Sequence, residues 1–176
     1  MKLSDSQPDL ELIHRDGVST LYYDAEMPGS YIVWHGFASS ADFRATCLRS
    51  LELSRERRIY KSISDARNMR IISLADQRWL AEEFLPMMLD MGISPKFYSG
   101  TIMPNDYFGR QSLDTLNEQV KDMLATQYKD VQSFTRYFDS YEDARAWLLT
   151  VDASESNVRM LSSEPANEAV PRAEAA

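Results

Sequence analysis

The sequence predicts an α/β domain built on one mixed sheet. Short segments rich in β-branched and aromatic residues alternate with segments whose apolar residues recur at helical spacing, and a Ser-x-x-Asp pattern marks the change from one to the other. Strict alternation after the first two strands requires crossover connections, which are almost always right-handed. We therefore predict a five-strand mixed sheet with an antiparallel edge hairpin, followed by alternating strands and helices, with four helices in all.

The predicted strands have the length and composition that strands favour. They are residues 20–27, 31–37, 59–64, 97–103 and 131–138. Pro28-Gly29-Ser30 separates the first two strands. Because proline presets one turn angle and glycine tolerates a positive one, these two strands should form an antiparallel hairpin.

Three helices have clear start signals. Ser39, Ser73 and Ser140 are each followed three residues later by aspartate, which predicts a hydroxyl cap and an acid in the first helical turn. Apolar residues at helical spacing follow each serine, and a further helical stripe runs from Leu113 to Leu124. In the second helix, Pro86 predicts a kink or break, since proline lacks the N–H that an interior position needs.

Charge and composition argue against several classes of binding partner and indicate a compartment. The chain has 27 acidic and 19 basic residues and a net charge of −8, which argues against nucleic acid and anionic membranes. No apolar run approaches the roughly 18 residues of a membrane span, and the N-terminus has no apolar signal core. With Cys47 as the only cysteine, no internal disulfide can form, and we expect a cytoplasmic protein without a metal or cofactor.

The aromatic residues indicate where the core begins and ends. All of them lie between Tyr22 and Trp147, and large aromatic side chains dominate core burial. We predict a flexible lead-in over 1–9, one domain over 10–151 and a disordered tail over 152–176. The tail is rich in Ala, Ser, Glu and Pro, and so cannot bury enough apolar surface to offset the entropy of ordering it.

Several short motifs accompany this order of elements. They are Trp34-His35-Gly36-Phe37 in the second strand, the segment 65–69 (DARNM) after the third, Trp79 in the following helix, and the closing segment 138–148 (FDSYEDARAWL). Together they resemble the STAS domain of bacterial anti-sigma-factor antagonists, and more closely small bacterial SpoIIAA-like proteins of the STAS/Sec14-like kind. The resemblance covers about 20–150 and implies the SpoIIAA-like fold and a role in binding a partner protein.

One part of the chain departs from that family. The antagonists carry Asp-Ser-Ser-Gly before their second helix, where a kinase phosphorylates a serine, but residues 70–73 read Arg-Ile-Ile-Ser. Ser73 lies nearby at a predicted helix start, where a phosphate would meet unpaired N–H groups. Ser73 is thus either a phosphorylation switch or simply a helix cap.

Asp65 and Arg67 form the best polar candidate site. They follow the central strand at its carboxyl end, where open α/β sheets place their ligands. Arg67 could grip a carboxylate or phosphate through its planar fork, or it could pair with Asp65. With Ser73, these two residues form the predicted interaction or switch site of a non-catalytic, regulatory protein-interaction module.

Two alternatives belong to other classes of protein. A small-molecule or lipid carrier would use an apolar pocket lined by Trp34, His35, Trp79 and Met87 or Met91. An enzyme would use His35 as a base with Asp65. The sequence contains no zinc-ligand spacing, phosphate loop or nucleophile with a partnered base, and Cys47 falls on an apolar helical stripe, so we expect no catalytic residue.

Overall fold

A computed structural model describes residues 9–94 and 96–161. These residues form a mixed sheet of six strands in the order β1-β2-β3-β4-β5-β6. The strands are β1 (Leu10–Arg15), β2 (Ser19–Asp24), β3 (Gly29–Trp34), β4 (Lys61–Asp65), β5 (Lys96–Ile102) and β6 (Gln132–Phe138). The first three strands pair antiparallel, and β3 to β6 pair parallel.

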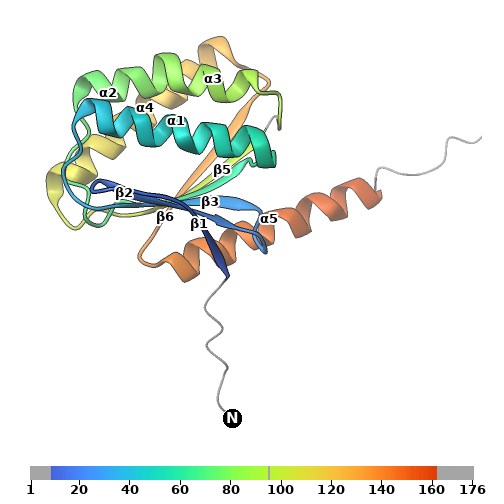
Figure 1. Cartoon of the computed structure of the whole chain (residues 1–176). Coiled ribbons are helices and arrows are strands. Elements are labelled where there is room, and N and C mark those ends of the chain that lie inside the picture. Colours follow the sequence, from blue (N-terminus) through green and yellow to red (C-terminus); the bar gives the residue numbers. More distant parts are fainter. Residues whose placement is uncertain (1–8, 95, 162–176) are drawn as a thin grey trace, which may run out of the picture.

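Helices cover both faces of the sheet (Figure 1). They are α1 (Ser40–Arg57), a continuous helix made of α2 (Leu74–Trp79), η1 (Leu80–Phe84) and α3 (Leu85–Asp90), then α4 (Tyr107–Gln127) and α5 (Tyr141–Leu161). Each parallel strand from β4 to β6 is placed on the same side of the strand before it. When such connections are all right-handed, their helices lie on one face of the sheet. The helices up to α4 therefore share a face, and α5, which follows the last strand, packs on the other.

The sheet has six strands because β1 adds to the outside of the predicted hairpin, which corrects the expectation of five. β1 pairs antiparallel with β2. It has no aromatic residue and is mostly exposed, and Leu12 is about half-exposed. Backbone pairing rather than burial holds β1 in place, and so composition did not reveal it.

The turn of the hairpin lies earlier than predicted. β2 ends at Asp24, and residues 25–28 form the turn, whereas the sequence predicted a strand through residue 27. Asp24 Oδ1 accepts hydrogen bonds from the backbone N–H groups of Glu26 and Met27, both at 3.0 Å, which closes the turn. A β-carbon on Gly29 would lie 2.7 Å from Met27 Sδ, so any other residue there would require the buried side chain of Met27 to shift.

The three predicted helix caps are confirmed. Each serine Oγ accepts a hydrogen bond from the backbone N–H three residues on, and donates one to that aspartate's carboxylate. The N–H bonds to Ser39, Ser73 and Ser140 measure 3.2, 3.1 and 3.2 Å. The fourth cap, Asp106, accepts from Gly109 N–H at 2.9 Å and begins α4.

Pro86 produces a change of helical winding and no break. The helix runs from α2 into α3 through the π-helical turn η1, where the N–H of Leu85 reaches back to the carbonyl of Leu80. The π turn immediately precedes Pro86, which has no N–H to give to the helical ladder. The helix ends before Gly92, which adopts a positive φ of 61°.

The last helix extends past the predicted end of the domain. α5 continues to Leu161, so residues 152–161 are helical where composition predicted the start of a disordered tail. Ala, Glu, Arg, Met and Leu within this stretch have high helix propensity and favour a helix that has already begun. Residues 1–8 and 162–176, which include most of the predicted lead-in and tail, lie outside the described residues.

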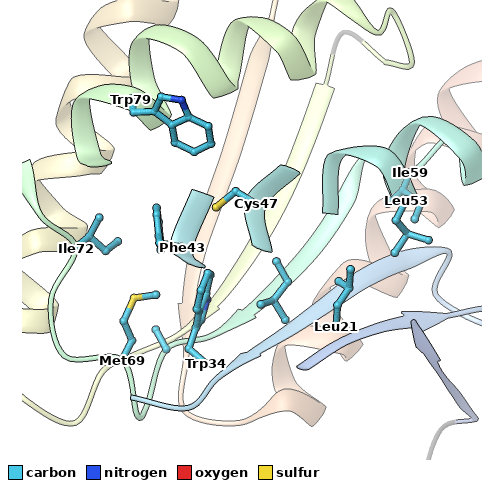
Figure 2. Close-up of a cluster of buried hydrophobic side chains, with 11 residues drawn as sticks. Leu21, Trp34, Phe43, Cys47, Leu53, Ile59, Met69, Ile72 and Trp79 are labelled. Atoms are coloured by element: carbon cyan, nitrogen blue, oxygen red, sulfur yellow. The ribbon is translucent and has the colours of Figure 1, made fainter. Parts of the chain in front are cut away.

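Two apolar layers flank the sheet. The first, between the sheet and α1 and α2, contains Trp34, Phe43, Cys47 and Trp79 (Figure 2). The second joins Tyr31 and Ile63 to Tyr141 and Leu148 of α5. No helix in the described part of the chain combines the length and apolarity needed to cross a bilayer.

Candidate functional site

Asp65 and Arg67 are bonded to each other. Asp65 ends β4 and is only 4% exposed. Arg67 Nε donates to Asp65 Oδ1 at 3.0 Å and Nη2 donates to Oδ2 at 2.7 Å, a two-point ion pair that the N–H of Arg67 completes at 3.2 Å. The hydrogen bond to Asp65 and its charge raise the pKa of Arg67. The Arg67 guanidinium is therefore already bonded within the chain, which favours its ion pair with Asp65 over the binding of an external carboxylate or phosphate.

Tyr31 adds a third group to this pair. Its hydroxyl donates to Asp65 Oδ2 at 3.3 Å from the neighbouring strand β3. Burial and then the charge of Asp65 raise the pKa of Tyr31 further above its ordinary value, at which the hydroxyl is already protonated at neutral pH. Asp65 therefore ties two parallel strands to the loop that follows β4.

Ser73 belongs to a separate network. Its Oγ donates to Asp76 Oδ2 at 2.6 Å, and Asp76 also accepts from Ser40 Oγ at 2.7 Å and Arg44 Nε at 2.8 Å. Burial tends to raise the pKa of Asp76, but the hydrogen bonds from these three residues outweigh it and lower the pKa. A phosphate on Ser73 would lie against this carboxylate, so the geometry favours Ser73 as a cap over Ser73 as a switch.

The structure does not bring the predicted apolar pocket together. Trp34 stacks on Phe43 with 5.2 Å between ring centroids, and Trp79 packs against Phe84 at 5.6 Å, so both tryptophans are core residues (Figure 2). Met87 is exposed at 39% on the outer side of α3, and Met91 is half-buried at its end.

His35 forms no hydrogen bond with Asp65, the acid with which the enzyme hypothesis combines it. It follows β3 as an exposed residue, and its Nε2 lies 2.7 Å from Thr20 Oγ1. Asp65 is bonded instead to Arg67 and Tyr31. Within the described ranges, no group of three His, Cys, Asp or Glu side chains is placed to hold a metal ion.

Cys47 is buried in the first apolar layer. Burial, and then the negative charge of Asp76, raises the pKa of its thiol to about 12. Since only the thiolate reacts, we expect Cys47 in the folded chain at pH 8 to react with iodoacetamide about a thousandfold more slowly than in chain unfolded by urea. Mass spectrometry of quenched samples measures both rates, and equal rates would show that the thiol is accessible.

A group of exposed apolar side chains surrounds the carboxyl ends of β4 and β5. Ile71, Leu74 and Phe108 are 52, 67 and 66% exposed, and all three line a cavity of about 220 Å³ between the loop before α2 and the first turns of α4. Large exposed apolar side chains that gather at one place mark interaction sites. We call these three residues the docking face.

Gln77 supplies a polar group beside the docking face. It lines the same cavity and is only 3% exposed. Its Nε2 donates to the carbonyl of Ile72 at 2.8 Å, which fixes the orientation of the amide, and its Oε1 has no partner among the described residues. A buried acceptor without a donor costs free energy, so the hydrogen bonding of Gln77 is incomplete beside the docking face.

Arginines border the docking face on its other side. Arg67 and Arg70 line a hollow of about 500 Å³ together with Ile71, Phe108 and the single acid Asp106. Arg67 is neutralised by Asp65, but Arg70 is exposed and makes no ion pair with the described residues. Arg70 is therefore an exposed cation without an ion-pair partner among the described residues, beside the docking face of a chain whose net charge is −8.

The predicted site residues and two residues of the docking face, Ile71 and Leu74, lie on or at the ends of the same connection from β4 to α2. Asp65, Arg67 and Ser73 all lie on the connection from β4 to α2, yet each is engaged in internal bonds. Ile71 and Leu74 lie on either side of the capping Ser73, and Tyr107-Phe108 follows a predicted strand. Large apolar residues in or next to predicted loops were therefore the sequence signal that could have indicated the docking face.

Comparisons of the chain with protein-family models, with curated proteins and with solved structures gave no significant match. The arrangement of side chains at the docking face therefore carries the functional argument.

Proposed function

We propose that the protein is a non-catalytic interaction module of STAS/SpoIIAA-like type that binds a partner protein through the docking face. The observation that carries this proposal is the convergence of Ile71, Leu74 and Phe108 on one cavity, all more than half exposed. Aromatic side chains and arginine are enriched at the centres of protein interfaces, and Phe108 and Arg70 lie beside each other here. The cytoplasm remains the compartment that we expect.

The surroundings of the docking face indicate the chemistry of the partner. Its three exposed apolar side chains suit contact with one bulky aliphatic or aromatic side chain. Arg70 favours a segment that carries acidic residues. The partner is therefore an acidic protein segment with an exposed apolar anchor.

Site-specific crosslinking tests this proposal on the full chain in its own cells. A photoreactive benzoylphenylalanine at position 108 should crosslink one protein with an acidic, apolar segment, and Leu74→Asp in the same chain should abolish the crosslink. The same amino acid at position 149, an exposed leucine on α5, is the matched control and should not capture that protein.

Binding of the purified partner then gives a magnitude. Phe108→Ala should raise the dissociation constant of the complex about 10-fold or more, and Leu149→Ala should leave it unchanged. The proposal fails if positions 108 and 149 capture the same proteins equally. It also fails if position 108 crosslinks only a second copy of this chain.

A further inference from the structure

The sheet face under α3 and α4 is lined with hydroxyl groups. Ile63, Tyr98 and Ile102 pack against α5, so their neighbours in sequence point to the other face, toward the helices. Ser62 and Ser99 are two of these neighbours and stand in register on β4 and β5. Thr135 of β6 stands in register beside Ser99, so the three hydroxyls lie side by side across the sheet. On β2 and β3 the same face carries Leu21, Ile32 and Trp34 instead.

A cavity of about 220 Å³ lies over these hydroxyls. Its walls are apolar side chains of η1 and α3, and its floor is the hydroxyl row. The walls include Leu80, Phe84, Leu85 and Met88, and the floor Ser62, Ser99, Ser133 and Thr135. We call this the inner cavity.

The arrangement of the helices explains why the inner cavity is not filled. α4 packs on α3 through Leu85, Met123 and Leu124, so these apolar side chains meet one another instead of the strands. The π-helical turn η1 lies directly over the cavity, and such turns occur frequently at binding sites. In the floor, Ser62 Oγ donates to Ser99 Oγ at 3.3 Å.

The inner cavity has an entrance at the edge of the sheet. A groove of about 490 Å³ runs between α4 and β6, and it shares Asn117, Val120, Ser133 and Thr135 with the inner cavity. β6 is the last strand of the sheet, so no further strand of the described chain covers this groove. A small molecule can therefore reach the hydroxyl floor from solvent.

The lining indicates a neutral ligand. Lys61 is the one charged residue among those that line the inner cavity, and its Nζ donates to the carbonyl of Leu148 in α5, on the opposite face of the sheet. Apolar walls with a few hydroxyls suit a molecule that has an apolar body and one hydrogen-bonding group. The volume exceeds the ~150 Å³ of a cavity that accommodates benzene.

We propose that the inner cavity is a binding site for a small neutral alcohol, phenol or ketone. The apolar body of the ligand lies against Phe84 and Met88, and its oxygen exchanges hydrogen bonds with the hydroxyls of Ser99 and Thr135. This site is separate from the docking face and does not depend on the proposed partner.

Para-cresol titrated into the purified full chain tests this proposal by calorimetry and by thermal unfolding. Saturable binding with a rise in Tm is expected. The singly charged para-hydroxybenzoate should bind at least 10-fold more weakly, because the walls offer no cation to its carboxylate.

Two substitutions locate the bound molecule. Ser99→Met extends a side chain from the floor into the cavity and should weaken the binding of para-cresol at least 10-fold. Thr126→Met, on an exposed turn of α4, should leave the binding of para-cresol unchanged. If Ser99→Met does not fold, as judged by its circular dichroism, Ser133→Met near the entrance replaces it.

Three results would overturn the proposal. The first is that para-cresol shows no saturable binding at millimolar concentration. The second is that para-cresol binds the wild-type chain and the folded Ser99→Met or Ser133→Met variant equally well. The third is that Leu74→Asp, which leaves the floor of the inner cavity unchanged, abolishes the binding of para-cresol. None of these results affects the crosslinking test of the docking face, so the two proposals fail separately.

Discussion

Replacing Asp24 by alanine is expected to lower the free energy of unfolding by about 3–5 kcal/mol. The side chain of Asp24 is fully buried, and it accepts from Arg145 Nε at 2.5 Å and from the Tyr141 hydroxyl at 2.9 Å. Both donors come from α5, so Asp24 fastens that helix to the hairpin. Its removal leaves Arg145, itself largely buried, with only the exposed carboxylate of Glu26 as an ion-pair partner.

Glu26 provides a matched control, because it pairs with the same Arg145 at 2.6 Å but is 69% exposed. Glu26→Ala should cost less than about 1 kcal/mol, as exposed ion pairs do. Urea unfolding followed by circular dichroism measures both variants. Equal losses would show that burial does not set the value of this ion pair.

The same residue makes stability depend on pH. Burial tends to raise the pKa of Asp24, but hydrogen bonds from Arg145, Met27 N–H and Tyr141 outweigh it, and the net pKa is lowered. A carboxyl whose pKa is lower in the folded chain stabilises the fold above its unfolded pKa of about 3.9, and this contribution is lost as the pH falls through the folded value. The wild-type chain should therefore lose more stability than Asp24→Ala on acidification below about pH 4.

Replacing Trp34 by alanine is expected to cost about 3–5 kcal/mol and to leave the docking face intact. Trp34 is 3% exposed, stacks on Phe43 and donates from Nε1 to Ser64 Oγ at 3.2 Å. Its removal leaves a void between β3 and α1 that the surrounding side chains fill only in part.

Two further variants separate the contributions to the Trp34 result. Trp34→Phe keeps the ring contact but loses the hydrogen bond and some volume, so it should cost markedly less than alanine. Phe37→Ala, three residues on but 71% exposed, should change stability by less than about 0.5 kcal/mol. If Trp34→Ala is as stable as Phe37→Ala, then Trp34 is not a core residue and a ligand pocket there becomes the better interpretation.

Local signals predicted the elements of this fold well. Ser39, Ser73 and Ser140 cap helices as expected, because a cap is a hydrogen bond between residues only three apart. Strand composition located β2 to β6 to within a few residues at either end. The strand that was missed, β1, is held by its backbone bonds to β2, which no side-chain pattern encodes.

The candidate site was harder to predict than the fold. The sequence directed attention to the loop after β4 because ligands gather at the carboxyl ends of parallel strands. It could not show that Arg67 is occupied by Asp65 or that Ser73 is held by Asp76, since both depend on side-chain geometry. Nor could it show that Phe108, about forty residues further along, meets Ile71 at one cavity.

The sequence by itself determined the α/β class, the helix starts and the single buried cysteine, because periodicity, capping and burial tendency act over a few neighbouring residues. Only the tertiary structure decided that β1 extends the sheet, that the predicted pocket tryptophans are core, and that a hydroxyl-lined cavity remains under η1. These features depend on contacts between elements far apart in the chain, where the fit of whole helices and strands, and not local preference, sets which side chains meet.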